Sequence, residues 1–184
     1  MPTIVEEVPF DGALERAKRL GLDPVLNEIR TVLTRFPLLV KEEKDANGAA
    51  ALREILDNEF TKVSGWIQGG SGETDWSKCL TVNDVKVCIG VEIQVSARSD
   101  LTIIDVAHLR EAIQEGMIDV GVIVTPSDRL GHFLTDRAPS ISAAKRAVKE
   151  ARAEDSPLLL ISLEHDGAGP PLPKRPKKSG KPNL

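Results

Sequence analysis

The chain of 184 residues has few cysteines and no long apolar run. Its two cysteines, Cys79 and Cys88, lack C-x-x-C spacing, and this pattern predicts a reduced protein without a disulfide scaffold. No apolar run approaches the ~20 residues that a membrane-spanning helix needs, and nothing near Met1 resembles a signal peptide. We therefore expect a soluble, cytoplasmic protein with no membrane partner.

Two further kinds of site are excluded by what is missing. The three histidines have no metal-ligand spacing with one another or with the cysteines, which argues against a zinc site. The glycine-rich segment 64–78 has no lysine where a Walker A loop requires one, which excludes nucleotide binding of that type. Its tryptophans, Trp66 and Trp76, either line a nucleic-acid channel or pack at the two ends of a hairpin.

The charge balance gives no uniformly basic surface, since the formal net charge is -4. Five basic and no acidic residues follow Gly169, so the chain without them has 19 basic against 28 acidic residues, a net charge of -9. A nucleic acid would have to bind a defined surface rather than bulk charge. We expect one domain, residues 1–168, and a disordered basic, proline-rich tail, residues 169–184, that adds only non-specific affinity.

The pattern of apolar residues is that of an α/β protein. Caps and helical spacing predict helices at about 11–20, 23–36, 48–60, 99–116 and 140–153. Alternating or continuous apolar runs predict strands at about 85–96, 118–125 and 157–164. Residues 1–10 are expected to be an extended lead-in, and residues 127–139 a polar loop. The prediction is a mixed β-sheet with helices on both faces.

The most informative stretch is residues 83–96. From Val85 onward apolar side chains alternate with other residues, as in a strand with one buried face. Glu92 and Gln94 project from the other face, with side-chain origins roughly 7 Å apart. Asp84, at the head of the run, joins them if the chain bends between. Together these residues outline a metal-dependent phosphoryl-transfer site.

This arrangement resembles a known nuclease family. Asp84 followed by Glu-x-Gln resembles the signature of PD-(D/E)xK nucleases, in the variant in which glutamine replaces the final lysine. That variant marks type II restriction endonucleases of the BglII/BstYI kind, related to the BamHI group. The strand V-E-I-Q-V-S at 91–96 and the segment G-M-I-D-V-G-V at 116–122 resemble the family's V-E-V-Q-F-S and G-H-I-D-V-G segments.

The resemblance implies a restriction-endonuclease-like mixed sheet flanked by helices and Mg²⁺-dependent hydrolysis of double-stranded DNA. It also implies a homodimer that acts on a short palindrome, with a GATC-centred site suggested by analogy. A cognate DNA methyltransferase is the implied genetic partner. The dimer interface is expected on helix 101–113 or on the N-terminal helices.

The resemblance also assigns roles to residues. Asp84 and the backbone carbonyl of Ile93 are expected to bind Mg²⁺, which takes oxygen ligands. Glu92 is expected to bind the metal, directly or through a water, and Gln94 to orient the attacking water. Neutral Gln94 departs from the standard motif because it cannot supply the positive charge of lysine.

Other candidates surround this strand. Either Glu59 or Glu73 could supply a further carboxylate, the alternative being a solvated acid. Arginine and polar side chains beside the site can bind phosphate or base edges, the alternative being a solvated loop. The candidate DNA contacts are Ser96, Arg98, Ser99, Arg129, His132 and Arg137.

Three functions follow from these observations. The leading one is a site-specific DNA endonuclease. The second is a protein of the same fold that binds DNA or a partner without cutting, and absence of Mg²⁺-dependent nicking would favour it. The third is an unrelated α/β protein in which Glu92 and Gln94 are merely exposed, and failure to retain duplex DNA would favour it.

Overall fold

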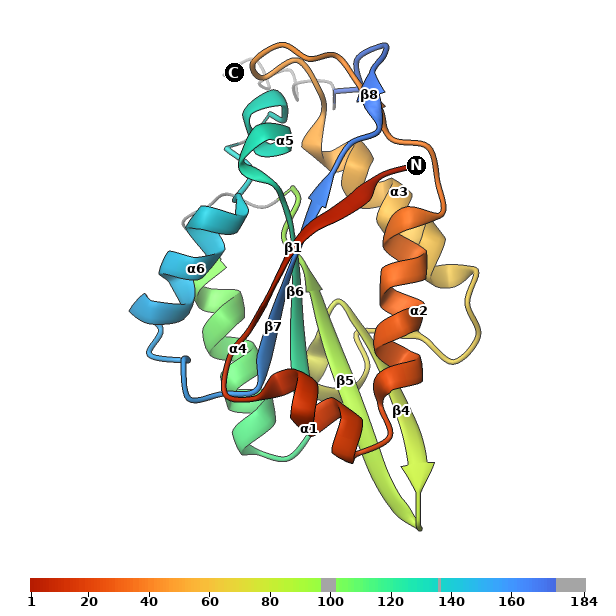
Figure 1. Cartoon of the computed structure of the whole chain (residues 1–184), viewed down its shortest axis with the longest axis vertical. Coiled ribbons are helices and arrows are strands. Elements are labelled where there is room, and N and C mark those ends of the chain that lie inside the picture. The colour runs from red at the N-terminus through yellow and green to blue at the C-terminus, as the bar shows by residue number, and fades with distance from the viewer. Residues whose placement is uncertain (97–101, 136, 175–184) are drawn as a thin grey trace, which may run out of the picture.

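The computed structural model describes residues 1–96, 102–135 and 137–174, which form a β-sheet between two layers of helices (Figure 1). The six strands lie in the order β1-β7-β6-β5-β4-β3. Strands β5, β6 and β7 are parallel, whereas β1, β3 and β4 run antiparallel to their neighbours. The strands are β1 (Thr3–Pro9), β3 (Ile67–Gln68), β4 (Trp76–Val82), β5 (Val85–Ile93), β6 (Val120–Pro126) and β7 (Leu158–Glu164). The predicted α/β class with a mixed sheet is confirmed.

Each face of the sheet has its own hydrophobic core. One face is covered by α1 (Ala13–Arg19), α2 (Asp23–Thr34) and α3 (Ala49–Thr61). The other is covered by α4 (Thr102–Gln114) and α6 (Ile141–Glu150). A short helix, α5 (Asp128–Phe133), follows β6, and a 3₁₀ turn, η1 (Ser71–Glu73), precedes β4.

Helix α2 shows how the sequence builds these layers. It begins at Asp23 followed by Pro24, whose missing N–H is not needed in the first turn of a helix. Its buried residues recur every three or four positions, so that they form one apolar stripe toward the sheet. They are Val25, Leu26, Ile29, Val32 and Leu33.

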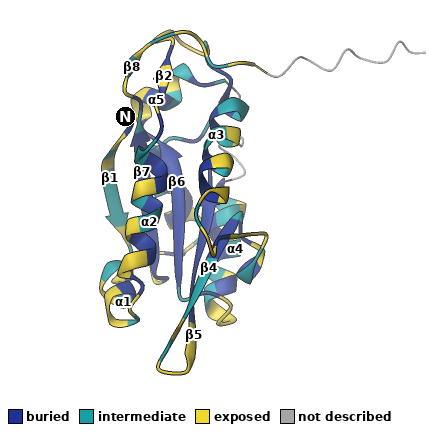
Figure 2. Ribbon diagram, turned by 90° about the vertical axis from the view of Figure 1, so that its right-hand side faces the viewer, coloured by how far each residue is buried: buried dark blue, intermediate teal, exposed yellow. Residues whose placement is uncertain are grey.

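Strand β5 is covered on both faces, not on one as predicted. Ile89, Val91 and Ile93 join the core under α1, α2 and α3, while Cys88 joins the core under α4 and α6. Figure 2 shows the buried course of β5 and β6 and the exposed tip of the β4–β5 hairpin. Polar side chains on the second face of β5 are therefore removed from water, which is costly unless they find partners.

The N-terminal segment belongs to the sheet. Residues 1–10, expected as a lead-in, contain β1, which pairs antiparallel with β7. A register shift between Ile4 and Glu6 breaks the alternation, and this explains why the segment did not read as a strand. The predicted polar loop 127–139 likewise contains α5, whose first turn is capped by the Ser127 hydroxyl accepting from the Leu130 N–H at 2.9 Å.

The expectation of a protein without a disulfide is wrong. Cys79 of β4 and Cys88 of β5 are joined by a disulfide. The two residues are direct cross-strand partners, with Cα atoms 4.1 Å apart. Strand pairing thus brings together two cysteines whose spacing in the sequence matched no motif.

The start of the predicted tail is part of the fold. A second, two-stranded sheet pairs β2 (Leu39–Val40) with β8 (Gly167–Ala168). Beyond it, the Leu172 N–H donates to the buried Asn47 side chain at 3.1 Å, and the Gly48 N–H donates to the Leu172 carbonyl at 3.1 Å. A Cβ atom at Gly48 would lie 1.9 Å from the Pro173 carbonyl oxygen, so only glycine fits there.

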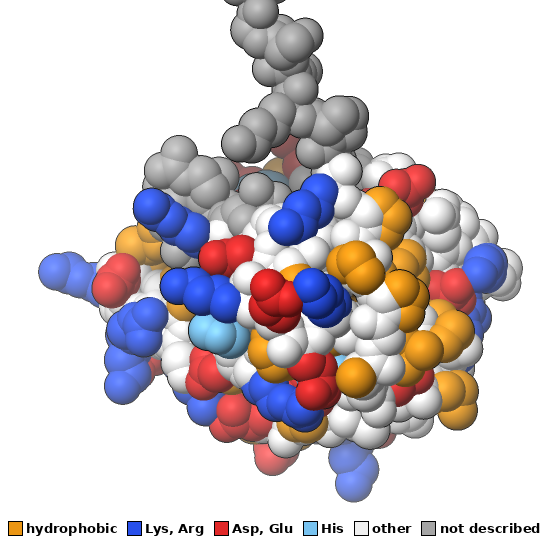
Figure 3. Space-filling view, turned by 90° about the horizontal axis from the view of Figure 1, so that it is seen from above, with side chains coloured by type: hydrophobic (Ala, Val, Ile, Leu, Met, Phe, Trp, Pro, Cys, Tyr) orange, Lys and Arg blue, Asp and Glu red, His pale blue; other side chains and the backbone are white. Residues whose placement is uncertain are grey.

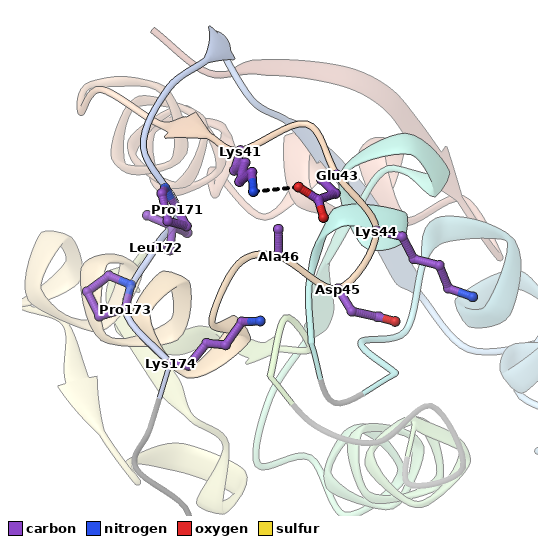
Figure 4. A pocket seen from close by; sticks show the side chains of 9 residues that line it. All are labelled: Lys41, Glu43, Lys44, Asp45, Ala46, Pro171, Leu172, Pro173 and Lys174. Carbon is purple, nitrogen blue, oxygen red and sulfur yellow. Dashed lines mark ion pairs between the residues drawn. The ribbon is translucent and has the colours of Figure 1, made fainter.

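These contacts create an open hollow of about 420 Å³ between the 41–46 loop and residues 171–174 (Figure 4). Lys41 and Glu43 form an ion pair on its wall, 2.5 Å apart. Residues 171–174 of the segment expected to be a disordered tail thus line this hollow, and residues 175–184 lie outside the described residues. In the part of the chain that the structure describes, no helix is long and apolar enough to cross a membrane.

Candidate active site

Glu92 and Gln94 lie where β5 ends, beneath α4. Both side chains are buried, with exposed fractions of 5% and 4%. The Gln94 N–H donates to the Val124 carbonyl at 2.8 Å, which continues the pairing with β6. His108 of α4 places Nδ1 3.7 Å from Glu92 Oε1, and Gln94 hydrogen-bonds to Asp105 of the same helix. The two predicted residues therefore share one buried polar cluster.

Asp84 is not part of this cluster, which corrects the prediction. It sits with Asn83 in the two-residue turn that joins β4 to β5, and both residues have positive φ angles. Eight residues of extended strand separate Asp84 from Glu92, a distance of roughly 26 Å at strand rise. The chain does not bend between them, because β5 is continuous from Val85 to Ile93.

Asp75 takes the place that Asp84 was expected to fill. It directly precedes β4, and β4 pairs with β5 in a register in which Trp76 faces Val91. The same register places Asp75 opposite Glu92. Its Oδ2 accepts from the Ile93 N–H at 2.8 Å. The cluster is therefore built at the end of the hairpin that lies opposite its turn. Asp75 follows from the sequence only if Asn83-Asp84 is recognised as that turn.

Arg53 of α3 reaches into the same cluster. Its Nη2 lies 2.7 Å from Asp75 Oδ1, and its Nη1 donates to the Ile93 carbonyl at 3.1 Å. Its Nε donates to Asp57 Oδ2 at 2.8 Å. Burial lowers the pKa of Arg53, but the hydrogen bonds and charges of Asp75 and Asp57 outweigh it and raise the pKa. The guanidinium is thus a permanent positive charge at this site.

The carboxyl groups are crowded. Burial, and then the charge and hydrogen bonding of Asp75 together with the charge of Asp105, raise the pKa of Glu92 to about 9. Burial, followed by the charge of Asp75, also raises the pKa of Asp105. Three acids close enough to perturb one another favour a bound cation, which would allow all of them to ionise. Perturbed carboxyl groups of this kind are typical of functional sites.

The donor set fits a hard divalent ion. Asp75, Glu92 and the Ile93 carbonyl offer oxygen atoms, which Mg²⁺ prefers over nitrogen and sulfur. Among the described residues, the buried Gln94 Oε1 has no hydrogen-bond partner, so it is free to accept from a water. Within the same described residues, no group of three or more His, Cys, Asp or Glu side chains is arranged to hold a metal ion. A metal would therefore complete its shell with backbone and water oxygens.

The two other candidate carboxylates lie outside the cluster. Glu59 is buried and forms ion pairs with Arg35, at 2.6 Å, and with Lys62. Glu73 is exposed in the 3₁₀ turn, on the rim of a hollow lined also by His108. The structure instead adds Asp105 of α4, which no sequence motif indicated.

The glycine-rich segment packs rather than forming a channel. Trp66 and Trp76 are both buried against Phe60 of α3, with ring centroids 4.9 and 5.4 Å away. Trp76 also donates its indole N–H to Asp57 Oδ1 at 2.9 Å. This is the hairpin alternative, with a tryptophan packed near each end.

The candidate DNA contacts have mixed positions. Ser96 is half-buried, two residues after Gln94, while Arg98 and Ser99 lie outside the described residues. Arg129 pairs with Glu42 at 2.6 Å, and His132 and Arg137 are exposed. These last three follow β6, at the end of the sheet where Gln94 lies. Figure 3 looks onto this end and shows basic and acidic side chains interspersed, not a uniformly basic face.

Comparison with protein families identifies a known family. The model of a family described as restriction endonuclease BglII/BglIII matches residues 22–163. This range contains Arg53, Asp75, Glu92, Gln94 and Asp105, and it covers most of the sheet. Comparison with curated proteins gave no match. The mixed sheet flanked by helices agrees with the restriction-endonuclease-like fold predicted from the sequence.

Proposed function

Because the chain belongs to the restriction endonuclease BglII/BglIII family, we propose that it is a type II enzyme whose hydrolysis of double-stranded DNA depends on Mg²⁺. The observation that carries the chemistry is the buried cluster in which Asp75 faces Glu92 and bonds to the Ile93 N–H. Crowded carboxyl groups at one end of a sheet are suited to a cation that neutralises charge on a phosphate.

Asp75, Glu92 and the Ile93 carbonyl would hold the Mg²⁺. Once bound, the ion supplies positive charge that stabilises the phosphorane-like transition state and favours deprotonation of water. Asp75 is fixed for this purpose through the Ile93 N–H, and the rigid strand pair fixes Glu92 opposite it. The cation would also offset the burial and the mutual repulsion that together raise the pKa of Glu92.

The residues of the chain position the reacting water. Gln94 Oε1 is buried without a partner among the described residues. It accepts a hydrogen bond from the water, and this bond directs a lone pair of the water oxygen toward phosphorus. As the new P–O bond forms, one proton of the water is passed to Glu92 or to solvent. The bond from phosphorus to the leaving sugar oxygen breaks, and that oxygen takes up a proton from water.

The proposal extends to the assembly. One site of this kind cuts one strand, and a two-fold homodimer places two sites symmetrically about a short palindrome. A GATC-centred sequence remains the proposal by analogy, and a cognate DNA methyltransferase is the proposed genetic partner.

The same substitution at Asp75 and at Asp84 tests which aspartate belongs to the active site. Asp75→Asn should lower cleavage of a mixed plasmid substrate by at least ~100-fold, the scale for one positioned catalytic group, and Gln94→Ala should do likewise. Asp84→Asn, the same change in the remote turn of the hairpin, should leave cleavage unchanged. Full activity in Asp75→Asn would refute the site. A wild type that retains duplex DNA but never nicks it would favour the non-cutting alternative.

A further inference from the structure

Arg53 is placed to act on the substrate as well as on the fold. Its guanidinium bridges Asp75 and the Ile93 carbonyl, the same oxygen atoms that would hold a cation. The side chain is 22% exposed, so the cluster is reached from solvent beside it. Three bonds to described acceptors use three of its five N–H groups, which leaves two for an incoming phosphate oxygen.

The position of this guanidinium is fixed from behind. Its Nε donates to Asp57, one helical turn further along α3. The other oxygen of Asp57 accepts the Trp76 indole N–H, and that ring stacks on Phe60. Arg53 is therefore anchored at Nε while both Nη atoms point at the acidic cluster. A preorganised charge of this kind costs little reorganisation when negative charge develops.

Among the residues that the structure describes, the cluster has no other permanent charge of this sign. Asp75, Glu92 and Asp105 are acids and Gln94 is neutral, whereas attack on a phosphodiester adds negative charge at the phosphate oxygens. Arginine binds phosphate with two parallel N–H groups and stays protonated at any working pH. The chain thus carries the positive charge on helix α3 and not on strand β5.

On this basis, and resting on the proposed nuclease function, we propose that Arg53 is a catalytic residue whose guanidinium contacts the scissile phosphate and stabilises the charge of the transition state. No bond to Arg53 forms or breaks, and its protons stay in place. Its present contacts with Asp75 and the Ile93 carbonyl hold the site together until substrate and cation arrive.

Two variants distinguish the effect of the charge of Arg53 from that of its hydrogen bonds. Arg53→Gln keeps an N–H donor but no charge, and it should lower kcat by about 100-fold with DNA affinity in Ca²⁺ within about 3-fold. Arg53→Lys keeps the charge and should be at least ~10-fold faster than Arg53→Gln. Arg35→Gln, an equally half-buried arginine paired with Glu59, is the matched control and should keep its kcat. Equal rates for the two Arg53 variants would overturn the proposal.

Metal affinity gives a readout without cleavage. Because Arg53 occupies the same oxygens and repels a cation, Arg53→Gln should bind Mn²⁺ more tightly than the wild type, by about 5-fold in a titration followed by electron paramagnetic resonance. Weaker binding would mean a loosened site and would overturn the proposal. Cleavage by the wild type is measured first. An inactive wild type refutes the proposed function, whereas an active wild type with an unimpaired Arg53→Gln refutes only the role of Arg53.

Discussion

Replacing Glu92 by glutamine should stabilise the metal-free protein while it abolishes cleavage. Burial and the charge of Asp75 raise the pKa of Glu92 from 4.5 to about 9. At pH 7 the folded protein must then bind a proton that the unfolded chain releases. The pKa of Glu92 in the unfolded chain lies roughly 2.5 units below pH 7. Keeping the buried carboxyl group protonated at pH 7 therefore lowers the free energy of unfolding by about 3 kcal/mol. A neutral amide avoids this cost.

The sign fixes the pH window. Because the folded pKa lies above the unfolded one, the contribution of Glu92 to stability is full below pH 4.5 and falls as the pH rises toward about 9. Urea unfolding in EDTA should therefore show Glu92→Gln more stable than the wild type by about 2–3 kcal/mol at pH 7 and by less than about 1 kcal/mol at pH 5.

The exposed Glu54 of α3 provides the matched control, and Glu54→Gln should change stability little at either pH. Added Mg²⁺ should raise the unfolding midpoint of the wild type and not that of Glu92→Gln, since a ligand that binds only the folded state stabilises it. A Glu92→Gln protein that is less stable at pH 7 would refute the reasoning, as would a stability gain independent of pH.

Three other outcomes are expected. Asn47→Ala removes a fully buried side chain that forms four hydrogen bonds with backbone groups. It should lower the free energy of unfolding, measured in urea, by at least about 2 kcal/mol, and wild-type stability in this variant would contradict the prediction. Truncation after Lys174 should leave both stability and cut position unchanged by end-sequencing, whereas truncation after Gly169 removes the Leu172 contact and should lower the thermal midpoint only. Sedimentation with a short cognate duplex should show two chains per duplex, and one chain that still breaks both strands together would exclude the symmetric dimer.

Much of the fold follows from periodicity. Helix α2 and strands β6 and β7 are strongly patterned, and their packing agrees with the pattern. Alternation also locates strand β5, although it predicts one buried face where the structure has two. Strand β1 was missed because its register shift interrupts the alternation. The helix α5 was missed because one hydroxyl cap starts it in an otherwise polar segment.

The sequence predicts the part of the candidate site on β5 but not the part on β4, and the Asn83-Asp84 turn explains why. Glu92 and Gln94 follow from alternation, but Asp84 was chosen because it is near them along the chain. Asn-Asp between two β-branched runs is a hairpin signal. Counting outward from that turn pairs Cys79 with Cys88 and then Asp75 with Glu92, so both the disulfide and the missing carboxylate could have been found. Arg53 could not, because its role depends on how α3 packs across the sheet.

The Asn83-Asp84 turn also limits which changes of length this chain can accept. In an antiparallel pair the turn sets the register, and a slip by one residue reverses which face every side chain occupies. Inserting one residue between Val82 and Val85 would therefore move Asp75 out of its place opposite Glu92, although the insertion lies roughly 26 Å from Glu92. The hairpin tip, although exposed and distant from the cluster, should therefore tolerate substitutions that keep its positive φ angles and tolerate insertion or deletion hardly at all.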